Sequence, residues 1–285
     1  MNSQSQRRKH LACHALAVAG VAAALMAGQA LSASHVAAWE MRVCADPNHM
    51  PQTNRAMEGY ENRIAEILAD DLGAELTYQW WTQSQSMISD QLREGNCDMM
   101  IGVPDGGGTV ISTVAYYRSP YAFVYRTDED YDISSFDDPV LEELRLGTTS
   151  DVASPYLALR RRNLTHDVVL GASLRGAPDA SPAIVEEVAN GGVDVAILWG
   201  PEAGYFASLQ ETDLTVTPAP EIDLPFTPLY HTIVIAVRLG DESLRDLLNE
   251  AIARRWDDIQ AVLEEYRVPT LSLPRPTLSL EERQP

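Results

Sequence analysis

The sequence has little positive charge and almost no lysine. Lys9 is the only lysine among 285 residues, and Lys plus Arg number 21 against 41 Asp plus Glu, a formal net charge of −20. Nucleic acids and anionic lipid surfaces are bound through clustered basic side chains. The composition therefore argues against both partners. It leaves open whether the acidic surface reflects genome composition or adaptation to high salt.

Long apolar runs are confined to the N-terminus. The basic segment Arg7–Lys9 precedes the Ala-rich run Leu11–Met26, and Val36–Ala38 offers a small-residue cleavage site before Trp39. This pattern is typical of a signal peptide, and the run is too short for a comfortable membrane anchor. We expect residues 1–38 to be removed, which leaves a soluble periplasmic protein of 247 residues with 18 Arg, no Lys and a net charge of −23.

Familiar catalytic motifs are missing as well. There is no GxSxG or HExxH sequence, and the histidines of the mature chain, His49, His166 and His231, are scattered. The acidic segment Asp128–Asp132 lacks the spacing and terminal Glu of an EF-hand. The glycines after Asp105 lack the Lys and Ser/Thr of a P-loop. We therefore expect no enzymatic activity, no cofactor and no metal site.

Cysteine is scarce, and only Cys44 and Cys97 remain after the signal peptide. Cys44 lies late in the first predicted strand and Cys97 opens the third, and these strands are neighbours in doubly wound sheets of this type. The oxidising periplasm favours a disulfide between them. A metal pair is the competing interpretation, but no His lies at a standard spacing. Such a bridge would stabilise the fold by roughly 3–4 kcal/mol on the chain-entropy model.

Alternating strands and helices indicate an α/β fold. The first half of the mature chain predicts strands at Met41–Ala45, Glu75–Trp80 and Cys97–Val103, and helices at Gly59–Leu72 and Ser86–Glu94. The third strand is nearly continuous in apolar residues, as expected for burial on both faces. Polar loops such as Asp46–Asn48 would then meet at the carboxyl edge of a parallel sheet, where open α/β sheets bind ligands.

The pattern then repeats. Tyr116–Arg126 reads as an extended segment that leaves the first lobe, and the acidic stretch Thr127–Asp138 marks the crossing. Further strands are expected at Arg145–Thr148, Val168–Leu170, Val193–Trp199 and Ile233–Arg238. Helices are expected at Ser154–Asn163, Ser181–Asn190 (capped by Ser181) and Ser243–Tyr266, and another follows the strand break at Gly200-Pro201 and extends to Leu209. The predicted domains are the signal peptide 1–38, lobe 1 in residues 39–124 and 230–268, lobe 2 in residues 125–229, and a Pro-rich tail, 269–285. Two lobes joined by two crossings describe a hinged clamshell.

Several short motifs in this order resemble a known family. They are RVCADPN from Arg42, GYEN from Gly59, GNCD from Gly95, GVP from Gly102, YYRS from Tyr116 and WGPEAGY from Trp199. The mature chain is similar to type II periplasmic solute-binding proteins, and more narrowly to the J-type (MoxJ/XoxJ) accessory proteins of quinoprotein methanol dehydrogenase systems. The resemblance implies a bilobal fold of two doubly wound sheets and a two-segment hinge. It also implies a periplasmic role beside a pyrroloquinoline-quinone-dependent methanol dehydrogenase, together with the cytochrome c of that system.

The sequence departs from the amino-acid-binding relatives at both charged anchors. Those proteins hold the ligand carboxylate with an arginine just after the third strand, whereas this chain has Pro104-Asp105 followed by glycines and no cation until Arg118. They hold the ligand ammonium with an aspartate whose place falls at Trp199. An ordinary amino-acid ligand is therefore not expected. The rival interpretation is an ABC-transport receptor for another small solute. The sequence leaves open whether a small-molecule ligand binds in the cleft.

The candidate contacts in the cleft are polar strand-end residues and aromatic or Arg side chains, the common anchors of interfaces. They are Asp46, Asn48, Trp81, Asp105, Tyr116, Tyr117, Arg118, Thr149 and Trp199. Glu61 lies in the first turn of its helix, where an acid suits the helix dipole, and we assign it a structural role.

Overall fold

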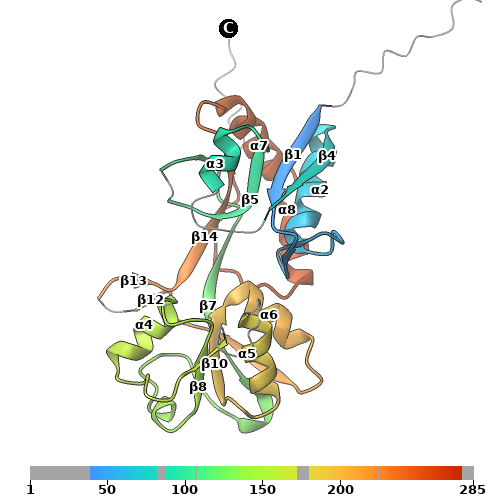
Figure 1. Ribbon diagram of the computed structural model, residues 1–285. Helices are drawn as coiled ribbons and strands as arrows, with labels where there is room; N and C mark the ends of the chain where they lie inside the picture. The colour runs from blue at the N-terminus through green and yellow to red at the C-terminus, as the bar shows by residue number, and fades with distance from the viewer. Residues whose placement is uncertain (1–38, 82–87, 107, 172–179, 224, 278–285) are drawn as a thin grey trace, which may run out of the picture. The chain divides into compact units, whose positions relative to one another are not determined.

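The computed structural model describes residues 39–81, 88–106, 108–171, 180–223 and 225–277 (Figure 1). The signal peptide expected for residues 1–38 and the last residues of the Pro-rich tail, 278–285, lie outside the described residues. Among the helices of the described ranges, none combines the length and apolar character needed to cross a bilayer.

Alternating strands and helices build the N-terminal half, as predicted. The elements are β1 (Glu40–Ala45), α2 (Tyr60–Leu72), β4 (Glu75–Trp80), α3 (Ile88–Arg93) and β5 (Met99–Pro104). Strand β1 pairs in parallel with both β4 and β5, so the first and third long strands are neighbours. The short pair β2 (Asn48–His49) and β3 (Thr53–Asn54) lies between β1 and α2 in the chain.

Two long strands connect this half with the next. Strand β14 (Tyr230–Val237) runs antiparallel to β5 and to the first residues of β7 (Tyr117–Arg126). From Tyr121 onward β7 pairs instead with β10 (Val195–Trp199) and, from Ala122, with β11 (Leu214–Pro218). The main sheet has the order β4-β1-β5-β14-β7-β10-β8-β9. In Figure 1, β7 and β14 form the connection between the two groups of elements.

The second half repeats the α/β pattern. Its further elements are β8 (Leu146–Thr148), α4 (Ser154–Arg161), β9 (Val169–Leu170), α5 (Ala180–Ala189) and α6 (Gly200–Ser208). Short elements complete the described chain: β6 (Ile111–Ser112), the 3-10 turns Thr127–Glu129 and Pro139–Glu142, and the hairpin β12 (Ile222–Asp223) with β13 (Thr227–Pro228). The helices α7 (Glu242–Arg254) and α8 (Trp256–Glu265) return to the first half.

The two groups of elements that β7 and β14 connect have separate cores of buried apolar residues. One core joins β1 and β5 to α2, α7 and α8, and includes Met41, Ile64 and Leu248, all fully buried. Other cores surround β7 and β10, with Phe123 and Ile197 on one face of that sheet and Val124 and Leu198 on the other. Alternate residues of one strand thus serve opposite faces, as the two-residue period of a strand requires. The expected α/β class is confirmed; the lobe boundaries stay a prediction.

The expected disulfide is present. Cys44 at the end of β1 and Cys97 just before β5 are bonded, with Cα atoms 5.5 Å apart and a sequence separation of 53 residues. Both side chains are buried. The bond ties the end of β1, where the loop at Asp46 begins, to the segment that enters the neighbouring strand β5.

Two expected helices differ in detail. The long helix expected over Ser243–Tyr266 is broken at Arg255, which separates α7 from α8. The break lets the apolar stripes of both helices reach the same core, while Arg255 pairs with Asp70 of α2 and with Asp258. Ser181 does not cap α5, because the helix begins one residue earlier, at Ala180; its hydroxyl donates to the Glu202 carboxylate, 2.6 Å away.

Candidate functional site

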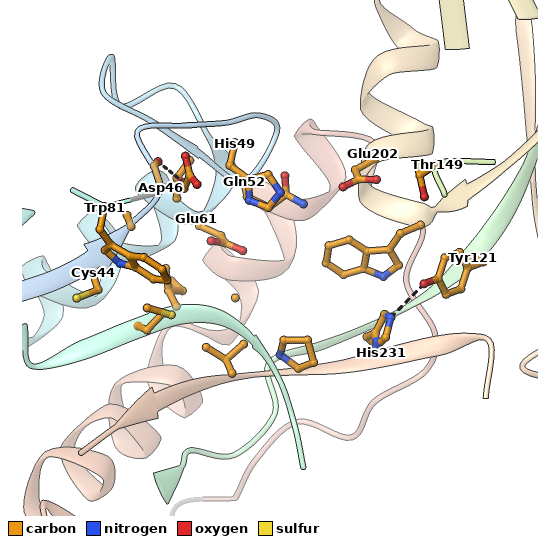
Figure 2. A pocket seen from close by; sticks show the side chains of 18 residues that line it. Cys44, Asp46, His49, Gln52, Glu61, Trp81, Tyr121, Thr149, Glu202 and His231 are labelled. Carbon is orange, nitrogen blue, oxygen red and sulfur yellow. Dashed lines mark hydrogen bonds between the residues drawn. The ribbon is translucent and has the colours of Figure 1, made fainter. Parts of the chain in front are cut away.

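A cavity of about 320 Å³ lies at the carboxyl ends of β1 and β5. Its other walls come from the loop before α2, the first turns of α2 and α6, the end of β10, and facing residues of β7 and β14. Figure 2 shows its side chains converging from these elements. The volume falls in the range of small-molecule pockets in proteins. The position is the sheet edge predicted from the sequence for ligand binding.

Glu61, in the first turn of α2, places its carboxyl group in the wall of this cavity. The side chain is only 6 % exposed, and burial raises the pKa of the carboxyl to about 8. Within the described ranges no side chain or backbone group hydrogen bonds to this carboxyl. Gly102 of β5, with φ +75°, allows its close approach, because a Cβ atom there would overlap the carboxyl group. At neutral pH Glu61 is therefore largely protonated while the cavity is empty.

Gln52 is a second buried polar group without a partner. The residue is 2 % exposed and lines the cavity, and neither its Nε2 nor its Oε1 has a hydrogen-bond partner in the described structure. Its position is set by the backbone: the carbonyl oxygen of Gln52 accepts from the Glu61 amide, 2.9 Å away. Gly59 permits this packing, since a Cβ there would overlap the Gln52 backbone. Buried polar groups normally find partners, so an unpartnered one in a cavity wall indicates a ligand site.

Aromatic side chains form much of the remaining wall. Trp81, 9 % exposed, and Trp199, the last residue of β10, both line the cavity. The Trp199 ring packs edge-on against His231, with centroids 5.8 Å apart. His231 in turn lies 3.4 Å (Nε2) from the Tyr121 hydroxyl, and burial lowers the pKa of its imidazole. His231 is therefore neutral at pH 7, and the wall gains no positive charge from it.

The charges in the wall are all acidic. Asp46 and Glu202 line the cavity beside Glu61, and no Arg or Lys does so among the residues that the structure describes. Asp46 accepts from the Asn48 amide, 2.9 Å away, and Glu202 accepts from the Ser181 hydroxyl. Arg118 does not reach the wall: it stacks on Tyr230, 4.2 Å from the ring centroid, and pairs with Glu221. The exposed residues Pro104 and Asp105 stand at the end of β5.

The predicted site residues fall into two groups. Asp46, Trp81, Thr149 and Trp199 line the cavity. The others lie elsewhere, and each has a structural setting of its own. Asn48 is exposed on β2, and Asp105 is exposed with its amide hydrogen-bonded to Thr232. Tyr116 and Tyr117 are buried, and the hydroxyl of each is hydrogen-bonded. Arg118 is held by Glu221 and Tyr230. Their roles as binding residues stay predictions.

Several lining residues were not predicted from the sequence. Gln52, Tyr121, Glu202 and His231 line the cavity, yet each belongs to a segment whose side-chain direction depends on the tertiary pairing. Glu61 was assigned a structural role, because an acid in the first turn of a helix suits the helix dipole. The signal that could have indicated it is the sequence GYEN after a turn-rich loop, which places an acid at the start of a helix facing the sheet edge. In the described ranges there is also no cluster of three or more potential metal ligands.

Comparison with known proteins identifies relatives of the whole mature chain. The family model of bacterial extracellular solute-binding proteins, family 3, matches residues 41–267. Protein MoxJ of Methylorubrum extorquens strain AM1 is 28% identical over 257 residues, 85% of each chain. Protein MoxJ of Paracoccus denitrificans is 28% identical over 271 residues, 89% of this chain and 95% of the relative. The crystal structure of the periplasmic binding protein XoxJ from Methylobacterium extorquens AM1 is 32% identical, with a TM-score of 0.69, and covers 82% of this chain and 100% of that one.

These matches confirm the resemblance read from the motifs. The family match extends over most of the chain, and the XoxJ structure shares both sequence and fold with it along its full length. The bilobal α/β architecture, with two crossings between groups of strands, agrees with both. The chain belongs to the bacterial extracellular solute-binding proteins of family 3, with the type II periplasmic-binding-protein fold and a MoxJ/XoxJ-like sequence.

Proposed function

We propose that this protein is a non-catalytic periplasmic accessory factor of a quinoprotein methanol or alcohol dehydrogenase. It would act by binding the dehydrogenase or by assisting its maturation, beside the cytochrome c of the same system. The observation that carries the proposal is the likeness to MoxJ and XoxJ proteins along nearly the whole mature chain. The motifs given above connect that likeness with dehydrogenase systems.

The cavity supports this proposal over amino-acid transport. An amino-acid carboxylate would lie among Asp46, Glu61 and Glu202, with no Arg or Lys lining the described part of the cavity. A charge-assisted hydrogen bond lost in this way is worth roughly 1.5–3 kcal/mol. The protein is therefore a poor receptor for ordinary amino acids.

The β12–β13 hairpin offers a surface for the dehydrogenase. Phe226 near its tip is 88% exposed and Ile222 is 57% exposed. Arg118 stacks on Tyr230 and pairs with Glu221, and this contact connects β7 with the hairpin. Aromatic and Arg side chains are the common energetic anchors of protein interfaces. We define this hairpin surface by Arg118, Ile222, Phe226 and Tyr230.

A capture experiment tests the proposal. Immobilised protein, residues 39–285, is incubated with periplasmic extract of its methanol-grown source, and captured proteins are identified by mass. We expect the dehydrogenase, with its quinone detected by absorbance after extraction. Phe226→Asp should reduce the captured amount at least fivefold. Val152→Asp is the matched control, since Val152 is 80% exposed on another part of the surface. Absence of the dehydrogenase, together with unaltered activity and quinone content when purified protein is added to it, would contradict the proposal.

A transport receptor for a different small solute is the second candidate. The unpartnered Gln52 amide and the Glu61 carboxyl in a cavity of about 320 Å³ favour ligand binding of some kind. Two results would favour this function over the first. One is tight binding of a solute that persists on dilution, and the other is growth that depends on both this gene and a neighbouring permease gene.

A further inference from the structure

We propose that the cavity binds a small organic ammonium cation that lacks a carboxylate, with the Glu61 carboxylate and the Gln52 amide oxygen accepting its N–H groups and Trp81 and Trp199 flanking its apolar part. This inference concerns the cavity alone and does not depend on an association with a dehydrogenase. It differs from the amino-acid site of related proteins, because the ligand has no anionic end.

The first support is the presence of two deeply buried polar groups with unused hydrogen-bonding capacity. Glu61 is 6% exposed and Gln52 is 2% exposed, and both line the cavity. Neither the nitrogen nor the oxygen of the Gln52 amide has a partner among the described residues. A ligand that donates N–H groups to Glu61 and Gln52 Oε1 would satisfy acceptors that the folded chain leaves open. Figure 2 shows both side chains on the same side of the cavity.

The second support is the sign of the charge. Asp46, Glu61 and Glu202 are the ionisable acids of the lining, and His231 is kept neutral by burial, which lowers its pKa. The described lining contains no Arg or Lys, and its other histidine is His49. An anion would therefore be repelled in a partly desolvated space, whereas a cation would be attracted.

The third support is the aromatic character of the wall. Trp81 and Trp199 both line the cavity. Indole rings attract ammonium groups and the polarised C–H groups next to them through their negative faces. A cavity of about 320 Å³ accommodates an amine with a modest apolar substituent.

Three probes of matched shape test the inference: 2-phenylethylammonium, 2-phenylethanol and 3-phenylpropionate. Each is titrated into the mature protein in phosphate buffer, which contains no amine, with isothermal calorimetry and tryptophan emission as readouts. We expect the ammonium probe to bind at least tenfold more tightly than the alcohol, and the carboxylate probe to show no saturation. Equal affinities for all three probes, or preference for the carboxylate, would overturn the proposal without any variant being needed.

Substitution of the proposed acceptor gives an independent test. Glu61→Gln keeps the shape but cannot ionise when a cation binds, so ammonium binding should weaken at least tenfold while binding of 2-phenylethanol changes less than twofold. Glu66→Gln, on the exposed face of the same helix, should leave both affinities unchanged. An ammonium affinity that is the same in Glu61→Gln and in the wild type would contradict the assignment of Glu61. None of these results depends on whether a dehydrogenase is captured.

Discussion

At the scale of single residues, Glu61 is the side chain whose role the sequence predicted least well. An acid in the first turn of a helix has a sufficient explanation in the helix dipole. The structure shows three features of Glu61 that the sequence does not reveal. Gln52, in the loop before α2, lies on one side of it and Gly102 of β5 lies on the other, and the Glu61 side chain is only 6% exposed. Trp81 and Trp199 were predicted as cleft residues from their places at strand ends, and both line the cavity.

The buried Glu61 carboxyl should make stability depend on pH. Its pKa of about 8 in the folded protein lies above the ordinary value of 4.5, so between these values the folded chain holds a proton that the unfolded chain releases. Its contribution to stability is complete below about pH 4.5 and is lost as the pH rises through 8. Each pKa unit corresponds to about 1.4 kcal/mol.

Glu61→Gln removes this dependence because Gln stays neutral. The free energy of unfolding of Glu61→Gln relative to wild type, from urea titrations, should rise by a few kcal/mol (about 2–5) between pH 5 and pH 8.5. Glu66→Gln, exposed on the same helix, controls for the loss of surface charge. A difference between Glu61→Gln and wild type that stays constant with pH would contradict burial of an ionisable Glu61.

Gly102 should resist substitution for two separable reasons. Its φ is +75°, and a Cβ would overlap the Glu61 carboxyl group. Gly102→Ala should therefore cost about 2 kcal/mol or more in unfolding free energy. Gly73→Ala is the matched control, because Gly73 has φ +62° with no atom within 4 Å of the added Cβ, and it should cost less. The loss of unfolding free energy in the double variant Gly102→Ala with Glu61→Ala should be at least about 0.5 kcal/mol smaller than the sum of the two single losses, as expected for coupled neighbours. Equal costs at the two glycines, with no recovery, would contradict the contact.

At the scale of secondary-structure elements, hydrophobic periodicity located most of the long strands and helices. Strand β4 (Glu75–Trp80) has the predicted ends, and α2 begins one residue after the expected start. The pattern did not show the break at Arg255, since the apolar positions of α7 and α8 continue one helical period. Four of the two-residue strands were also missed: β2, β3, β12 and β13 are defined by cross-strand bonds and not by a hydrophobic pattern.

The bond between Cys44 and Cys97 is the covalent link between β1 and the start of β5, and its removal should destabilise the protein. Replacement of both cysteines by Ala should lower the unfolding free energy by about 3–4 kcal/mol, because the bond closes a loop across a sequence separation of 53 residues. Urea titrations of the double variant and of the wild type in the absence of reductant measure the difference. Added reductant should lower the unfolding free energy of the wild type toward that of the variant, and it should leave the unfolding free energy of the variant unchanged. Identical stabilities would show that the bond does not form in the mature protein.

At the scale of the whole molecule, composition and motif order indicated the fold class and the family. The details of the cavity could not be obtained in this way, because its wall combines residues as far apart as Asp46 and His231. Their meeting depends on the pairing of β14 with β5 and with β7. A sequence pattern records which residues face a sheet, but not which distant strand supplies the opposite wall.

The acidic surface should make stability sensitive to salt. With 18 Arg against 41 acidic residues after signal removal, the mature chain repels itself at low ionic strength. If the surface is adapted to high salt, the thermal midpoint should rise from low salt to 1 M NaCl and should continue to rise beyond about 0.3 M, where screening is nearly complete. A midpoint that is flat over this range would exclude such adaptation and favour genome composition as the origin of the acidic residues.

The central claim, a role beside a quinoprotein dehydrogenase, is tested most directly in the source organism. The measurement is the methanol dehydrogenase activity, per amount of dehydrogenase protein, in periplasmic extract of cells that lack this gene. We predict a loss of at least fivefold, restored by the wild-type gene and not by a gene encoding Phe226→Asp. Activity equal to that of the parent cells would contradict the account.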